Sequence, residues 1–109
     1  MREALRILLI GAACSGRTLT YAEVAQSLGI PPKHTIHKAA LLIEDLMRHQ
    51  AAAGEPQLAS FVVSKARRDL PARGFFMLAR DLRLHEGADE GPEARSFVEA
   101  ERERCRAHF

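Results

Sequence analysis

The chain has 109 residues, of which 47% are hydrophobic and 28% charged, with a net charge of +2 and no low-complexity tract. These values favour one globular unit that buries a core without a metal or disulfides. The cysteines Cys14 and Cys105 lie far apart and indicate free thiols. The apolar run Leu5 to Cys14 is too short for a membrane span and is not followed by a secretory cleavage pattern. We therefore expect a soluble cytoplasmic protein.

The first predicted element is a helix over residues Arg2 to Ala13. Its apolar residues recur at helical spacing and leave only a narrow polar side: Leu5, Ile7, Leu8, Leu9, Ile10 and Ala12. Gly16 is expected to end this helix, and Arg17 to Leu19 to form a very short strand. A helix this apolar lies centrally or contacts another subunit.

Two helices joined by a turn are predicted over Thr18 to Met47. Thr20 followed by Glu23 forms a capping box that starts the first of them. Gly29 supplies the left-handed residue that ends it after Leu28. Pro31-Pro32 then prevents its continuation, and one of the two prolines suits the first turn of the next helix.

The second of these helices is predicted to bury one face and to run to Gln50 or Ala53, with Gly54 as its C-cap. The face comprises Ile36, Ala39, Ala40, Ile43, Leu46 and Met47. This arrangement resembles a helix-turn-helix, whose second helix reads the DNA major groove. Because Ile36 stands seven positions after Gly29, the turn is longer than in the commonest form of the motif.

Three segments follow the helix-turn-helix. Gln57 to Lys65 is rich in β-branched and aromatic residues and is predicted as a strand. Ala66 to Gly74 has no periodicity and is predicted as a basic loop. Phe75 to Leu84 returns to helical spacing, with a short strand around Arg73 to Phe76 as the alternative for its start.

The rest of the chain is predicted as an acidic linker and a last helix. His85 to Glu93 contains two glycines, a proline and four acids, so we expect it to be exposed and mobile. Pro92 opens a helix over Glu93 to His108 whose apolar positions are sparse. Residues 1–83 carry 12 Lys and Arg against 7 Asp and Glu, whereas residues 84–109 carry 4 against 7, so a basic body precedes an acidic tail.

This order predicts a mainly α (α+β) fold, with a winged helix-turn-helix domain over residues 1–84 and an acidic linker with a C-terminal helix over 85–109. The loop after the strand would be the wing, and its predicted phosphate contacts are Lys65, Arg67, Arg68 and Arg73. The second helix would contact DNA through Lys33, His34, Thr35, His37 and Lys38. None of these five is the Arg or Asn of a strong bidentate base contact, and a solvated basic surface is the alternative for both groups.

A second resemblance covers Thr20 to Val63. TYAEVAQSLGIPP (Thr20 to Pro32) and GEPQLASFVV (Gly54 to Val63) resemble the DNA-binding domain of the alkyltransferase and alkyltransferase-like proteins. That family has a tyrosine opening the first motif helix, a glycine ending it, another helix and a proline-containing extended segment. Its Pro-Cys-His-Arg acceptor motif is replaced by Phe-Val-Val-Ser at residues 61–64, so the resemblance implies DNA binding without alkyl transfer.

Enzymatic and metal chemistry find little support. The chain has no phosphate-binding loop, dinucleotide fingerprint or nucleophile elbow, so we predict no catalytic activity and no cofactor. The pairs His34–His37 and Cys105–His108 have a spacing that zinc could use, but nothing in the sequence brings them together, and we predict no metal.

The functional prediction is binding of double-stranded DNA, as a transcriptional regulator. The alternative is a protein–protein interaction module, an adaptor or inhibitor, that uses the same fold without DNA. The last helix has too few apolar residues to be stable alone and must find a surface, on its own chain or on a partner. We therefore predict a homodimer in which the first and last helices form the interface.

Overall fold

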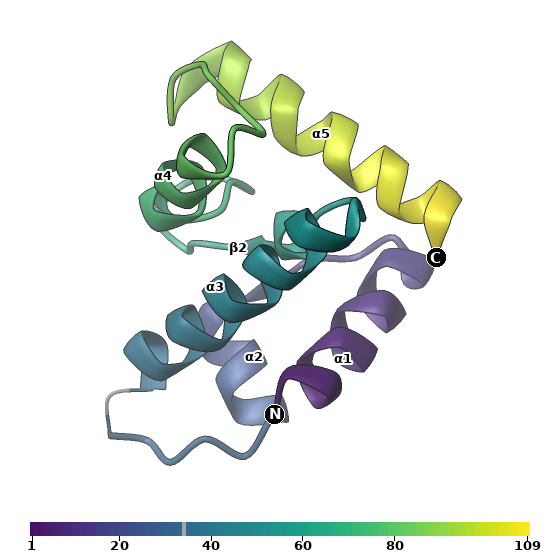
Figure 1. The fold of residues 1–109 in the computed structure, drawn as a ribbon. Helices are drawn as coiled ribbons and strands as arrows, with labels where there is room; N and C mark the ends of the chain where they lie inside the picture. Colours follow the sequence, from purple (N-terminus) through teal and green to yellow (C-terminus); the bar gives the residue numbers. More distant parts are fainter. Residues whose placement is uncertain (34) are drawn as a thin grey trace.

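The computed structural model describes residues 1–33 and 35–109. Its elements follow in the order α1 Arg2–Ser15, β1 Leu19–Thr20, α2 Tyr21–Ser27, α3 Thr35–Ala53, the 3-10 helix η1 Leu58–Phe61, β2 Val62–Val63, α4 Arg73–Asp81 and α5 Gly91–His108. Helix α3 runs through the middle of the molecule, α1 lies along one side, and α5 crosses beyond its C-terminal end (Figure 1). The predicted mainly helical fold is confirmed.

Helix α1 packs one face into the core, where Leu5, Leu9 and Ala12 are fully buried. Steps of four and three residues place these side chains on one side of the helix. Gly16 ends α1 in the left-handed conformation at φ 67°, as predicted. Ile7 points away from the core and is 63% exposed, so the apolar surface of α1 is wider than the face that the core covers.

Helix α2 begins with the predicted capping box. The Thr20 hydroxyl accepts a hydrogen bond from the Glu23 amide at 3.1 Å, and the Glu23 carboxylate accepts one from the Thr20 amide at 2.9 Å. The second bond favours the ionised acid, so it holds the pKa of Glu23 below its usual range. At the other end Gly29 has φ 71°, and the Ile30 amide closes the helix on the Ala25 carbonyl at 3.0 Å.

Helix α3 begins only at Thr35, so neither Pro31 nor Pro32 lies in its first turn, contrary to prediction. Its predicted end is confirmed by Gly54, which has φ 71°. The buried residues of α3 are Ala39, Ile43, Leu46, Met47 and Gln50. Ile36 was predicted on that face but is 59% exposed, because its side chain borders a cleft between α2 and the chain after β2 instead of entering the core.

The predicted strand Gln57–Lys65 is largely a different structure, since η1 occupies its first half and β2 comprises only two residues. Side-chain hydrogen bonds explain the difference. The Gln50 side chain accepts from the Leu58 amide at 3.0 Å, and the Ser60 hydroxyl donates to the Gln57 carbonyl at 2.8 Å. Such bonds offer the backbone an alternative to a sheet ladder, which β propensity does not register.

Strands β1 and β2 pair in parallel, with Leu19 opposite Val62 and Thr20 opposite Val63. The predicted wing is not confirmed. Residues 64–72, which we call the basic loop, lead from β2 into α4, and the part of the chain that the structure describes holds no third strand to complete a hairpin. The sheet instead joins the start of α2 to the start of the basic loop.

Helix α5 docks on the body of its own chain, where it contacts η1 and α1. Ala94, Val98 and Cys105 are buried and belong to the common core. Two charged residues that the sequence did not predict to be buried lie on the same face: Glu101 and Arg102, which are only 3% and 8% exposed. Polar contacts therefore supplement the thin apolar stripe in holding this helix.

The segment before α5 differs from the exposed linker that was predicted. His85 is buried, and its ring stacks on Phe97 with the two ring centroids 4.5 Å apart. Its Nε2 atom lies 3.0 Å from the carbonyl oxygen of Ala88. Glycine, proline and acidic residues predicted exposure correctly for Glu86 and Glu90, but they gave no sign of this aromatic contact. No helix in the described residues combines the length and apolarity needed to cross a membrane.

Replacing Thr20 by Ala removes the acceptor for the Glu23 amide. We expect the free energy of unfolding to fall by about 1 kcal/mol, measured by urea denaturation. Thr18→Ala is the matched control, because the described residues offer the Thr18 side chain no hydrogen-bond partner. An equal loss in both variants would contradict the cap.

The two cysteines should differ in reactivity. Cys14 is exposed, whereas burial raises the pKa of the Cys105 thiol from 9.0 to about 12. At pH 8 we expect a thiol reagent to modify Cys14 rapidly and Cys105 only on unfolding. Above pH 9 the unfolded thiol ionises and the buried one does not, so this group should lower the free energy of unfolding as the pH rises. A fast phase that survives in Cys14→Ala would contradict the assignment.

Candidate nucleic-acid interface

The start of α3 carries the first group of predicted DNA contacts. Three of them are exposed: Lys33 in the turn before α3, and His37 and Lys38 in its first turn. Thr35 is half-buried, and its hydroxyl donates to the Pro31 carbonyl at 2.9 Å, so it holds the turn instead of presenting a free donor. The fifth predicted contact, His34, lies outside the described residues.

An apolar cleft of about 270 Å³ separates α3 from the basic loop, and we call it the α3 cleft. Tyr21 and Ala22 of α2 border it, as do Ile36 and Ala40 of α3, the last residue of β2 and residues 64–66 after it. A smaller hollow that shares Tyr21 and Ala40 continues toward α4. The outer surface of the motif is therefore a basic helix beside an apolar groove.

The basic loop is closed by its own backbone. The Ser64 amide donates to the Leu70 carbonyl at 2.9 Å, and the Arg67 amide donates to the Ser64 carbonyl at 3.0 Å. At the end of the loop the Ala72 amide donates to the Tyr21 hydroxyl at 3.1 Å. The loop is thus fixed both internally and to the first residue of α2.

Arg67 was predicted to contact phosphate, but the structure turns its guanidinium inward. The group donates to the Pro71 carbonyl at 3.0 Å and to the Asp89 carbonyl, and it lies 5.5 Å from the centroid of the Phe76 ring. Two of its nitrogen atoms are thus bonded to backbone carbonyl oxygens. Arg67 therefore supports the loop.

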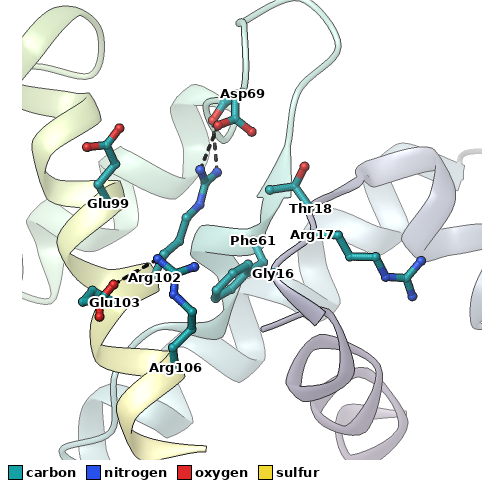
Figure 2. Close-up of a pocket in the computed structure, with 9 residues that line it drawn as sticks. All are labelled: Gly16, Arg17, Thr18, Phe61, Asp69, Glu99, Arg102, Glu103 and Arg106. Carbon is teal, nitrogen blue, oxygen red and sulfur yellow. Dashed lines mark hydrogen bonds and ion pairs between the residues drawn. The ribbon is translucent and has the colours of Figure 1, made fainter. Parts of the chain in front are cut away.

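Arg102 of α5 fixes the tip of the same loop (Figure 2). Its guanidinium donates to the Asp69 carboxylate at 2.9 Å and to the Asp69 carbonyl at 3.0 Å. Its Nε atom donates to the Ser60 carbonyl at 2.8 Å. Arg68 and Asp69 have φ 47° and 66°, a left-handed conformation that costs energy for residues other than glycine. The hydrogen bonds from Arg102 to Asp69 offset that cost.

The other predicted loop cations, Lys65, Arg68 and Arg73, remain exposed. Arg73 belongs to the first turn of α4 and not to the loop. Its guanidinium lies 3.7 Å from the Asp89 carboxylate and 4.0 Å from that of Glu90. Because the Arg73 side chain is 69% exposed, these ion pairs are weak and leave it accessible to another anion.

Sequence reasoning missed Tyr21 and Arg102 as supports of this surface. Arg102 stands among alternating Arg and Glu residues, which resemble a solvated helix face. The signal that could have found it is its spacing, since it follows Val98 by four positions and precedes Cys105 by three on the buried stripe. The contact of Tyr21 with Ala72 spans 51 residues and has no local signal.

A hollow of about 670 Å³ beside Arg102 is less suited to an anion. It is lined by three basic and three acidic side chains, and two of these, Arg106 and Glu103, pair at 3.2 Å (Figure 2). Within residues 1–33 and 35–109, no three His, Cys, Asp or Glu side chains gather closely enough to hold a metal ion. The basic surface around α3 and the loop is therefore the better candidate site.

Comparison of the chain with protein-family models, curated proteins and solved structures finds no match. The resemblances to a winged helix-turn-helix and to the alkyltransferase-like DNA-binding domain therefore stay predictions from the sequence.

Removing the Arg102 side chain should loosen the basic loop. In Arg102→Met the Ser60 carbonyl loses its partner in a buried site, and we expect the free energy of unfolding to fall by about 1–3 kcal/mol. Arg106→Met on the same helix removes only an exposed ion pair and should cost less than about 0.5 kcal/mol. Hydrogen exchange of the Ser64 amide should accelerate in the first variant alone. Equal behaviour of the two variants would mean that Arg102 does not hold the loop.

Proposed function

We propose that the protein binds double-stranded DNA through the start of α3 and the basic loop, and that it acts as a transcriptional regulator. The observation that supports this most is the position of cations on both flanks of the outer face of α3. Lys38 borders a hollow on one side of the helix, and Lys65 borders the α3 cleft on the other. His37 is exposed on the helical face between these flanks.

This arrangement fits a helix in the major groove. The groove is about 12 Å wide and lies between two phosphate backbones. A helix seated in it presents its outer face to base edges and its flanks to phosphates. Lys38 would then meet one backbone, while Lys65 and Arg68 would meet the other.

The available side chains indicate binding dominated by phosphates. The exposed side chain of His37 is placed to reach a base edge. The exposed Ile36 could contact a thymine methyl group. The described turns at the start of α3 hold no Arg or Asn for a bidentate base contact. We therefore propose strongly salt-dependent affinity with modest sequence discrimination.

One observation favours a protein partner as the second candidate. Ile36 and Leu41 are 59% and 52% exposed on α3, and Leu41 borders an apolar hollow of about 400 Å³ with Met1 and Ile30. Exposed apolar side chains beside an apolar hollow suit a protein interface. An apolar interface would keep its affinity as salt rises, whereas a DNA interface would lose it.

A homodimer through the first and last helices also stays a proposal. The buried face of α5 already lies on its own chain, so a partner would have to meet the outer faces of these helices. Ile7 on the outer face of α1 offers an exposed apolar group for such a contact. Two copies could place two α3 helices on one duplex.

Neutralising the flanking lysines tests the DNA proposal. We expect Lys38→Gln and Lys65→Gln each to weaken binding to a random-sequence duplex and to lower the slope of log affinity against log salt by about 1. Fluorescence anisotropy between about 50 and about 200 mM NaCl gives the slope. Arg106→Gln in the last turn of α5, far from the start of α3 (Figure 1), is the charge-matched control. Parent affinity that is independent of salt would favour the protein partner instead.

A further inference from the structure

A second hollow, of about 570 Å³, lies on the far side of the basic loop from the α3 cleft. Ser64, Ala66 and Ala72 border both spaces. The loop is therefore a ridge between an apolar groove beside α3 and a hollow beside α5. The two spaces differ in the chemistry of their walls.

The second hollow is lined by four arginines and one acid. The arginines are Arg67, Arg68, Arg73 and Arg95, and the acid is Glu90. Arg67 is occupied by carbonyl oxygens, but the other three are exposed. Arginine matches phosphate oxygens with its planar fork of donors, so this wall suits a phosphate group.

Arg95 joins α5 to this site. One of its Nη atoms donates to the carbonyl of Arg68 at 3.1 Å, which holds the guanidinium beside the loop. A guanidinium has five N–H donors, so this exposed side chain, which lines the hollow, keeps donors for an anion. Arg95 was not among the residues that the sequence singled out, since it stands in an acidic segment.

The acids near the hollow do not neutralise it strongly. Glu90 lies 4.0 Å from Arg73 and its side chain is 71% exposed. Asp89 lies 3.7 Å from the same guanidinium. Exposed pairs of this kind contribute little free energy, so a ligand with higher charge density displaces them.

We infer that the hollow binds a backbone phosphate of the same duplex, so that the DNA interface extends over the ridge to Arg95 of α5. This inference rests on the proposed function. The hollow is open and its arginines are exposed, so a free phosphate ion gains little there over water. A polyanion that already lies on α3 adds this contact at small entropic cost and releases further counterions.

The test compares Arg95→Gln with Arg106→Gln, which removes the same charge from the same helix. Anisotropy with a random-sequence duplex should show weaker binding and a salt slope lowered by about 1 for Arg95→Gln, and parent values for Arg106→Gln. Thermal unfolding of each variant measures the fold separately. Arg95→Lys keeps the charge and should keep the parent salt slope.

Three results of these duplex experiments would overturn the inference. Parent affinity and slope in Arg95→Gln, with losses in Lys38→Gln and Lys65→Gln, would remove the hollow from the interface and leave the proposed function standing. Equal losses in Arg95→Gln and Arg95→Lys at the parent slope would make Arg95 a support of the loop only. A parent protein without salt-dependent duplex binding would overturn both the inference and the proposed function.

The remaining experiment uses inorganic phosphate as the probe. Titration of the full chain with phosphate at constant ionic strength should show no saturable binding by calorimetry. Saturable binding that is lost in Arg95→Gln, with duplex affinity unchanged, would assign the hollow to a free phosphate compound and overturn the inference.

Discussion

The rest of the structure depends on the hydrogen bonds of one buried group, the guanidinium of Arg102. It bonds the Ser60 carbonyl in η1 and both the carboxylate and the carbonyl of Asp69 in the basic loop. Its neighbour Glu101 accepts a hydrogen bond from the Gln57 amide at 3.1 Å. A buried charge is costly unless every partner is in place, so these contacts select one docking of α5 more than they add stability.

That docking determines the candidate interface. With Asp69 held from α5, and Ala72 held by Tyr21, the basic loop has one position relative to α2. The parallel pairing of Thr20 with Val63 fixes the start of the basic loop relative to α2 as well. The cations on the loop and on α3 therefore stand on one rigid support, which reduces the conformational entropy that a ligand must remove on binding.

Ion pairing decides where the net basic charge becomes available. Arg2 pairs with Asp45 at 2.7 Å, and Arg6 pairs with Glu55 at 2.6 Å. The hydrogen bond from Arg6 holds the pKa of Glu55 below its usual range, so that acid stays ionised. The basic residues of α1 are thus matched by acids, whereas Lys38 at the start of α3 and Lys65 and Arg68 of the loop are exposed. Because these pairs neutralise the arginines of α1, the net positive charge predicted for residues 1–83 is exposed at the start of α3 and on the basic loop.

The sequence by itself determined the features that depend on neighbours a few residues apart. The capping box of Thr20, the helix ends at Gly16, Gly29 and Gly54, and the entry of α5 at Pro92 are each set by backbone conformation and local hydrogen bonds. Only the tertiary structure decided that Val62 and Val63 pair in parallel with β1, that Arg67 turns inward, and that Arg95 and Arg102 reach the loop. These outcomes depend on partners 22 to 43 residues away, whose positions exist only after the core has packed.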